Sequence, residues 1–106
     1  MITQEQIQAV AHQIAQKFNP LKVLLFGSYG RNEAHPRSDV DLLVILEDDQ
    51  RVDDPEVEVA TSVTHSFPMD ILVRSPQQVA ERLRMGDSFY RDIVEKGVVL
   101  YERPGG

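Results

Sequence analysis

Apolar residues recur along the chain with two spacings, one typical of helices and the other of strands. The first helix is predicted by a stripe of apolar residues at helical spacing: Ile7, Val10, Ala11, Ile14, Ala15 and Phe18. Thr3 and Gln6 have the spacing of a capping box at the start of this helix. The dipeptide Asn19-Pro20 predicts its end, because the residue before a proline disfavours helical backbone.

After this helix, apolar runs of strand length alternate with helical segments. Strands are predicted over 21–26, 40–46, 69–73 and 98–101. Helices are predicted over 28–34, opening at Ser28, and over 55–65, starting at Pro55. Another is predicted to begin at Pro76, with Ser75 as its cap, and to end at a break over 85–87. The last is predicted over 88–96, with Asp87 as its cap and Gly97 as its C-terminal glycine. This order predicts a sheet covered by helices. The short connection between the first two strands is compatible with either parallel or antiparallel pairing.

The composition narrows the class of protein. A length of 106 residues predicts one domain, spanning 1–106, with a single core. The hydrophobic content of 42% and charged content of 26% indicate a globular chain rather than a disordered one. The chain has no cysteine, which excludes disulfides, thiolate zinc sites and cysteine nucleophiles. No apolar run approaches the roughly 18 residues of a membrane span, and the first twenty residues do not resemble a secretory signal, so we expect a cytoplasmic protein.

The charge balance indicates which partners to expect. The net charge of −6 argues against stable binding to nucleic acid, because proteins that grip its backbone are usually basic. A small anionic substrate stays compatible, since a bound cation can reverse the local field. Five of the eight residues of segment 47–54 are acidic, which predicts a solvated loop. Residues 103–106 are expected to fray.

A first candidate site lies at Gly27-Ser28, where a buried strand ends and a helix is predicted to begin. Glycine lets the backbone turn and approach a ligand closely. The start of a helix presents unpaired N–H groups that suit an anion such as a phosphate. An ordinary turn with a capping serine explains the same two residues.

A second candidate site is Asp39-Val40-Asp41. Side chains alternate across a strand, so Asp39 and Asp41 are expected on one face, about 6–7 Å apart at the backbone. This spacing lets both carboxylates reach one divalent ion or two neighbouring ions, and hard oxygen ligands favour Mg²⁺ or Mn²⁺. Two acids at the mouth of a strand, facing water or paired with arginine, are the simpler alternative.

Two further residues bear on this cluster. Asp70 interrupts another apolar run, and it joins the first pair if its strand neighbours theirs; otherwise it is an acid on an edge strand. Three carboxylates on one face cannot all stay ionised without a cation. Arg31, one turn after Ser28, is placed to reach a phosphate oxygen or to pair with Asp39.

Taken together, these residues resemble a known superfamily. Gly27-Ser28, ten intervening residues and Asp39-x-Asp41 resemble the signature of the nucleotidyltransferases that include DNA polymerase β. The small size, the position of Arg31, the third acid Asp70 and the ending 93–102 resemble its minimal nucleotidyltransferase branch. Tyr29, Gly30 and Asn32 stand where that family often has arginine, alanine and glycine. The resemblance covers about residues 5 to 102 and implies an α/β (α+β) fold with a small mixed sheet flanked by helices.

The resemblance also implies a mechanism. Asp39 and Asp41 would hold two Mg²⁺ ions, and Asp70 would bind the second ion and help to activate an acceptor hydroxyl. Gly27 and Ser28, with Arg31 nearby, would hold the triphosphate of ATP. The acceptor would attack the α-phosphorus and pyrophosphate would leave.

The acceptor implied by the branch is a protein. The chain is nearly all catalytic core, so we expect a partner to supply the acceptor surface. In the minimal branch this partner is commonly a HEPN-domain toxin, and the nucleotidyltransferase acts as the antitoxin by transferring AMP to a toxin tyrosine. An exposed member of the pair Phe89-Tyr90 would indicate a partner surface.

Parts of the same pattern are compatible with two other functions. A binding module could neutralise the partner by contact alone, but it would have no need for three costly acids. A phosphatase-type aspartate nucleophile at Asp39 is disfavoured, because Pro36-Arg37-Ser38 precedes it in place of an apolar strand.

Overall fold

The computed structural model describes residues 2–47 and 53–105 of the chain. Its elements follow the predicted order of helices and strands. The helices are α1 (Gln4–Phe18), α2 (Gly27–Gly30), α3 (Pro55–Ser62), α4 (Pro76–Arg84) and α5 (Ser88–Lys96). The strands are β1 (Lys22–Phe26), β2 (Val40–Ile45), β3 (Met69–Arg74) and β4 (Val98–Glu102). Most of the loop predicted over 47–54 lies outside the described residues.

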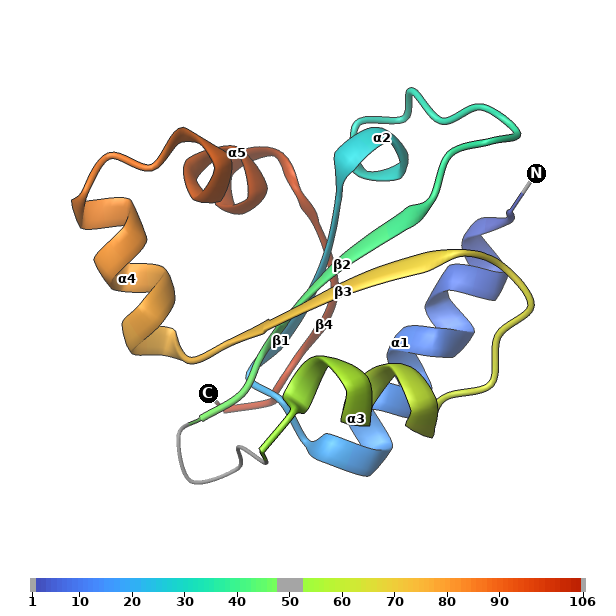
Figure 1. Ribbon diagram of the computed structural model, residues 1–106, viewed down its shortest axis with the longest axis horizontal. Helices are drawn as coiled ribbons and strands as arrows, with labels where there is room; N and C mark the ends of the chain where they lie inside the picture. The colour runs from blue at the N-terminus through green and yellow to red at the C-terminus, as the bar shows by residue number, and fades with distance from the viewer. Residues whose placement is uncertain (1, 48–52, 106) are drawn as a thin grey trace.

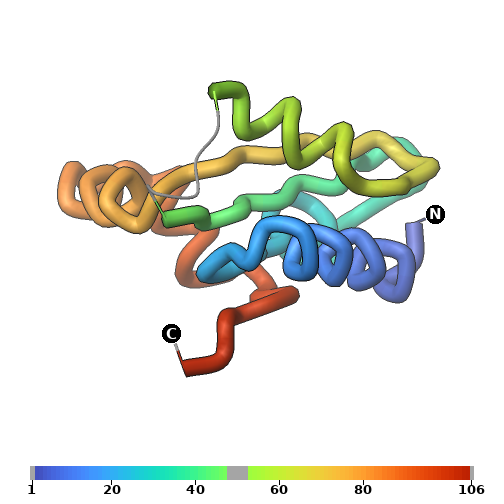
Figure 2. The backbone as a smooth tube through the Cα atoms, turned by 90° about the horizontal axis from the view of Figure 1, so that it is seen from below, coloured from blue at the N-terminus to red at the C-terminus, as the bar shows by residue number. Residues whose placement is uncertain are grey.

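The four strands form one mixed sheet in the order β3-β2-β1-β4. The pairs β1–β2 and β1–β4 are antiparallel, and β2–β3 is parallel. The connection through α2, which the sequence left open, therefore joins antiparallel neighbours. Figure 2 views the molecule from below, where β3 and β4 occupy opposite edges of the sheet. The predicted class, a small mixed sheet flanked by helices, is confirmed.

Helices cover both faces of this sheet and create two apolar clusters (Figure 1). The larger cluster joins α1 and α3 to one face, on which Val40, Leu42 and Val44 of β2 are fully buried. The smaller cluster joins α4 and α5 to the opposite face through Leu43 and Ile45. Because side chains alternate along a strand, Asp41 belongs to the face of the smaller cluster. The candidate site therefore lies on the face of the sheet that α4 and α5 cover.

The predicted caps form. Thr3 and Gln6 close a capping box on α1, and Ser75 and Gln78 close another on α4. Asp87 accepts hydrogen bonds from the first backbone N–H groups of α5. Asn19 ends α1, as predicted, in a left-handed conformation with φ of 47°, which asparagine tolerates better than most residues. Among the described residues, no helix has the length and apolar character needed to cross a membrane.

Three local predictions were wrong. The second helix begins at Gly27 rather than Ser28 and ends at Gly30, and no side chain caps it, because the capping position falls on Phe26. Helix α3 ends at Ser62 rather than at 65, since the buried Val63 turns to extended backbone towards β3. By contrast, Gly97 ends α5 as predicted; its φ is −68°, and glycine is needed there because a Cβ would lie 2.3 Å from the Ile93 carbonyl oxygen.

The third error concerns the residues after β4. Arg103 does not fray: its backbone N–H donates to the Leu21 carbonyl at 2.9 Å. Its guanidinium donates to the Glu47 carboxylate at 2.5 Å and to the Asn19 carbonyl. These contacts link the segment after β4 to the residues just before β1 and just after β2, which lie at the same end of this antiparallel pair. Local residue preferences do not encode such a long-range arrangement.

Candidate active site

Asp41 stands at the centre of the candidate site. In the strand register it pairs with Phe26 of β1 on one side and with Asp70 of β3 on the other. Neighbouring strands lie about 4.8 Å apart, so the two aspartates start from adjacent backbone positions on the same face. The parallel pairing of β2 with β3 thus meets the condition on which the sequence-based cluster depended.

Gly27 gives Asp41 its place. It has φ of 69°, which suits glycine, and the ideal position of a Cβ on it lies only 2.2 Å from Asp41 Oδ2. The carboxylate therefore rests directly on the Gly27 backbone at the point where β1 passes into α2. The glycine is needed here for close approach as well as for the turn.

Asp39 lies immediately before β2, on the exposed loop that leads into it. Its negative charge is close enough to help raise the pKa of the Asp41 carboxyl. Within the described residues, no three His, Cys, Asp or Glu side chains gather closely enough, as they stand, to hold a metal ion. The three acids are neighbours in charge and backbone position rather than a closed cage.

The electrostatics of Asp41 indicate how a cation would fit. Burial, followed by the negative charges of Asp70 and Asp39, raises the pKa of the Asp41 carboxyl, and Arg31 opposes this. A divalent cation would offset both the burial and the like charges, and carboxylate oxygens are the ligands that Mg²⁺ prefers. The donor chemistry of Asp39, Asp41 and Asp70 therefore fits the ion implied by the resemblance.

A cleft of about 390 Å³ opens above these residues. Its lining residues come from β1, α2, β2, β3 and α5: Phe26, Gly27, Arg31, Asp41, Asp70, Leu72, Phe89, Asp92 and Ile93. Four of the six residues predicted for the site line this cleft, whereas Ser28 and Asp39 do not. The cleft is large enough for part of a nucleotide.

Arg31 faces the cleft but forms its ion pair elsewhere. Its Nε lies 3.5 Å from Glu33 Oε2, so the proposed pair with Asp39 is replaced by one with Glu33. Both side chains of the Arg31–Glu33 pair are well exposed, which makes it weak and easily exchanged for a bound anion. Asn32, where the family often has glycine, has φ of 57°, a conformation that asparagine tolerates better than most residues.

The sequence reading missed the wall that α5 contributes. Phe89 is 49% exposed, and its ring meets that of Phe26 edge to face at 5.6 Å, whereas Tyr90 is buried. Asp92 adds another carboxylate to the cleft and pairs with Lys96 at 3.3 Å. The signal was present, because positions 89, 92 and 93 share one face of a helix. That pattern alone does not predict that this face of α5 lines the same cleft as Asp70.

The raised pKa of Asp41 predicts a pH effect on stability in metal-free buffer. A carboxyl whose pKa is raised on folding loses stability as pH increases from its unfolded value of 3.8 through the folded value. We therefore expect the stability of Asp41→Asn, relative to that of the wild type, to increase as pH rises from about 3.5 to 7. Because Asp41 is only partly buried and solvent screens its charge, the difference in unfolding free energy is on the order of 0.5 kcal/mol, or about 2–4 °C in melting temperature. Thermal melts of both proteins with EDTA test it; a gap that shrinks with pH contradicts it.

Comparison with known proteins places this geometry in context. The family model described as "Polymerase beta, Nucleotidyltransferase" matches residues 5–105. A Methanocaldococcus jannaschii protein named "Putative protein adenylyltransferase" is 30% identical over 82 residues, covering 76% of this chain and 77% of that protein. The bifunctional uridylyltransferase/uridylyl-removing enzyme of Pseudomonas aeruginosa is 33% identical over 86 residues, which cover 74% of this chain and only 10% of the enzyme.

A solved structure agrees on the fold. The crystal structure of a "putative nucleotidyltransferase" from Sulfolobus solfataricus superposes with a TM-score of 0.64 at 21% sequence identity. The superposition covers 96% of this chain and 82% of the other. At this identity the likeness concerns the arrangement of helices and strands.

Proposed function

The chain belongs to the Polymerase beta nucleotidyltransferase family, and on that basis we propose that it transfers AMP from ATP to the tyrosine hydroxyl of a partner protein in a Mg²⁺-dependent reaction. The observation that carries the proposal is the position of Asp41, between Gly27 at the β1–α2 junction and Asp70 on β3. The name of the Methanocaldococcus jannaschii relative supports a protein acceptor. The partner we propose is a HEPN-domain toxin in the cytoplasm, for which this chain is the antitoxin.

The triphosphate is proposed to lie at the β1–α2 junction. Backbone N–H groups at Gly27 and Ser28 and the Ser28 hydroxyl supply donors for phosphate oxygens there. Arg31 exchanges its exposed partner Glu33 for a phosphate oxygen. These contacts would hold the α-phosphorus over Asp41.

Asp39, Asp41 and Asp70 are the residues that would hold Mg²⁺. The ion supplies neutralisation of phosphate charge and lowers the pKa of a bound hydroxyl. Asp39 and Asp70 are both exposed, so their side chains are free to turn towards an ion beside Asp41. Asp41, resting on Gly27, is the fixed member of the set.

Asp70 lies on the acceptor's side of the site. In the proposed reaction its carboxylate receives the proton of the acceptor hydroxyl. The hydroxyl oxygen forms a bond to the α-phosphorus, the bond from that phosphorus to the bridging oxygen of the β-phosphate breaks, and pyrophosphate leaves with the electron pair. The half-exposed ring of Phe89 and the side chain of Leu72 give this side of the cleft an apolar wall.

Capture of the partner tests the proposal. The tagged chain is used to isolate bound proteins from its source cells, and the complex is incubated with Mg²⁺ and either ATP or UTP. Intact-mass analysis is expected to show the partner gaining whole AMP units with ATP and Mg²⁺, and no gain with EDTA. Gain of UMP units with UTP instead would identify UTP, rather than ATP, as the nucleotide substrate. A partner that stays bound but unmodified would favour an antitoxin that acts by contact alone.

A further inference from the structure

A second cavity, of about 420 Å³, lies beside the candidate active site. It is lined by Arg74 of β3, by Tyr90 of α5 and by four residues of α4, namely Gln77, Gln78, Glu81 and Arg82. Arg74 lies on the same face of β3 as Asp70 and Leu72, which line the catalytic cleft. Tyr90 directly follows Phe89, the aromatic wall of that cleft. The two cavities therefore adjoin along β3 and α5.

The linings of these neighbouring cavities differ in charge. The catalytic cleft is lined by three carboxylates, those of Asp41, Asp70 and Asp92, and by one guanidinium. The second cavity is lined by two guanidiniums, those of Arg74 and Arg82, and by one carboxylate. Each guanidinium has a carboxylate partner outside this lining, since Arg74 pairs with Glu56 at 3.2 Å and Arg82 with Asp87 at 3.7 Å. The Arg82 side chain is 54% exposed, so its ion pair is weak and easily exchanged for the carboxylate of a ligand.

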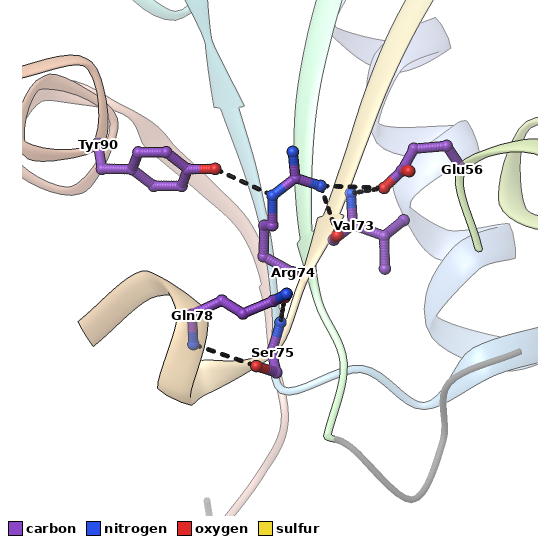
Figure 3. Close-up of polar contacts among 6 residues, drawn as sticks. All are labelled: Glu56, Val73, Arg74, Ser75, Gln78 and Tyr90. Carbon is purple, nitrogen blue, oxygen red and sulfur yellow. Dashed lines mark hydrogen bonds and ion pairs between the residues drawn. The ribbon is translucent and has the colours of Figure 1, made fainter. Parts of the chain in front are cut away.

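The Arg74 guanidinium is held in place before any ligand arrives (Figure 3). Its Nε donates to the Tyr90 hydroxyl at 3.0 Å, and its Nη1 donates to Glu56 Oε2 at 3.2 Å and to the Val73 carbonyl at 2.8 Å. Within the described part of the chain, Nη2 has no hydrogen-bond partner. Its side chain is only 30% exposed. A partly buried, oriented guanidinium whose Nη2 has no hydrogen-bond partner is suited to donate hydrogen bonds to a carboxylate.

We propose that this cavity, centred on Arg74 and Arg82, binds a carboxylate side chain of the acceptor protein. The inference rests on the proposed function, in which the triphosphate lies at Gly27, where β1 passes into α2. Arg74 lies beyond Asp70 on β3, at the opposite side of Asp41 from Gly27, so the cavity faces the acceptor rather than the phosphates. Asp70 and Arg74 are four residues apart, or about 13 Å along a strand. The acceptor would thus carry Asp or Glu about four extended residues from the modified tyrosine.

Short peptides test the proposal without the natural partner. The probes are acetyl-Tyr-Gly-Gly-Gly-Glu-amide and its reverse, each compared with the same peptide carrying Gln in place of Glu. Titration into ¹⁵N-labelled protein is followed by the signals of the Arg74 Nε–H and of the Gln77 and Gln78 side-chain amides. At least one Glu peptide is expected to shift these signals, with about tenfold weaker binding of its Gln counterpart.

Three variants make the test specific. Arg82→Gln is expected to weaken binding of the Glu peptide by about tenfold, whereas Arg91→Gln, at an exposed position of α5 outside the cavity, is expected to leave it unchanged. Arg74→Lys keeps the charge but loses the fork, and it is also expected to weaken binding. Equal shifts with Glu and Gln peptides, or no shifts, would overturn the proposal. Stronger shifts with inorganic phosphate would overturn it in favour of a phosphate subsite. The proposed transfer of AMP to the natural partner is tested separately, by the intact-mass analysis described above.

Discussion

Asp41→Asn is expected to lower nucleotidyl transfer by at least about a thousandfold while the protein stays folded. Asparagine has nearly the same shape as aspartate, so it fits over Gly27. It removes the negative charge from the acid that lies between Gly27 and Asp70. The charge that would hold a cation beside the α-phosphorus is then lost. Release of pyrophosphate and the mass gain of the partner measure the activity.

A matched control separates chemistry from general charge effects. Asp53→Asn makes the same chemical change at an exposed position outside the cleft and is expected to keep full activity. Asp41→Asn is also expected to melt no lower than the wild type at pH 7, because it removes a carboxylate whose pKa is raised by burial and like charges. Activity retained within tenfold of the wild type would rule out the proposed metal-binding role of Asp41.

The predictable part of this molecule is the part encoded by neighbours in the sequence. Thr3 with Gln6 and Ser75 with Gln78 form capping boxes, because each box needs only four residues. The order of helices and strands follows from periodicity and from caps of this kind. The boundary of α3 was missed because burial of Val63, a long-range contact, overrode the local pattern.

The candidate site shows the same limit. Side-chain alternation predicts that Asp39 and Asp41 share a face, but only the strand order decides whether Asp70 joins them. That order, with β3 beside β2, depends on packing across the whole sheet. For the same reason the α5 wall, with Phe89 and Asp92, could be listed as one helix face but could not be assigned to the cleft. Sequence motifs thus named the acids, and the tertiary structure added the wall opposite them.

Gly27→Ala is expected to damage both stability and activity. The new Cβ would fall 2.2 Å from Asp41 Oδ2, so the carboxylate or the strand end must move. Alanine at a positive φ costs about 1 kcal/mol, and the collision adds about 1–3 kcal/mol. Displacement of Asp41 by about 1 Å is expected to lower transfer at least about a hundredfold. Urea unfolding and the transfer assay measure the two effects.

Gly86→Ala provides the control for backbone strain alone. Gly86 has a similar φ of 79°, but a Cβ there meets no atom within 4 Å, so only the cost of about 1 kcal/mol is expected, with activity unchanged. If contact with Asp41 is the cause, the cost of Gly27→Ala should fall to that of Gly86→Ala in an Asp41→Ala background, where the carboxylate is absent. An undiminished cost in that background would show that Gly27 is required for the turn into α2 and not for seating the central aspartate.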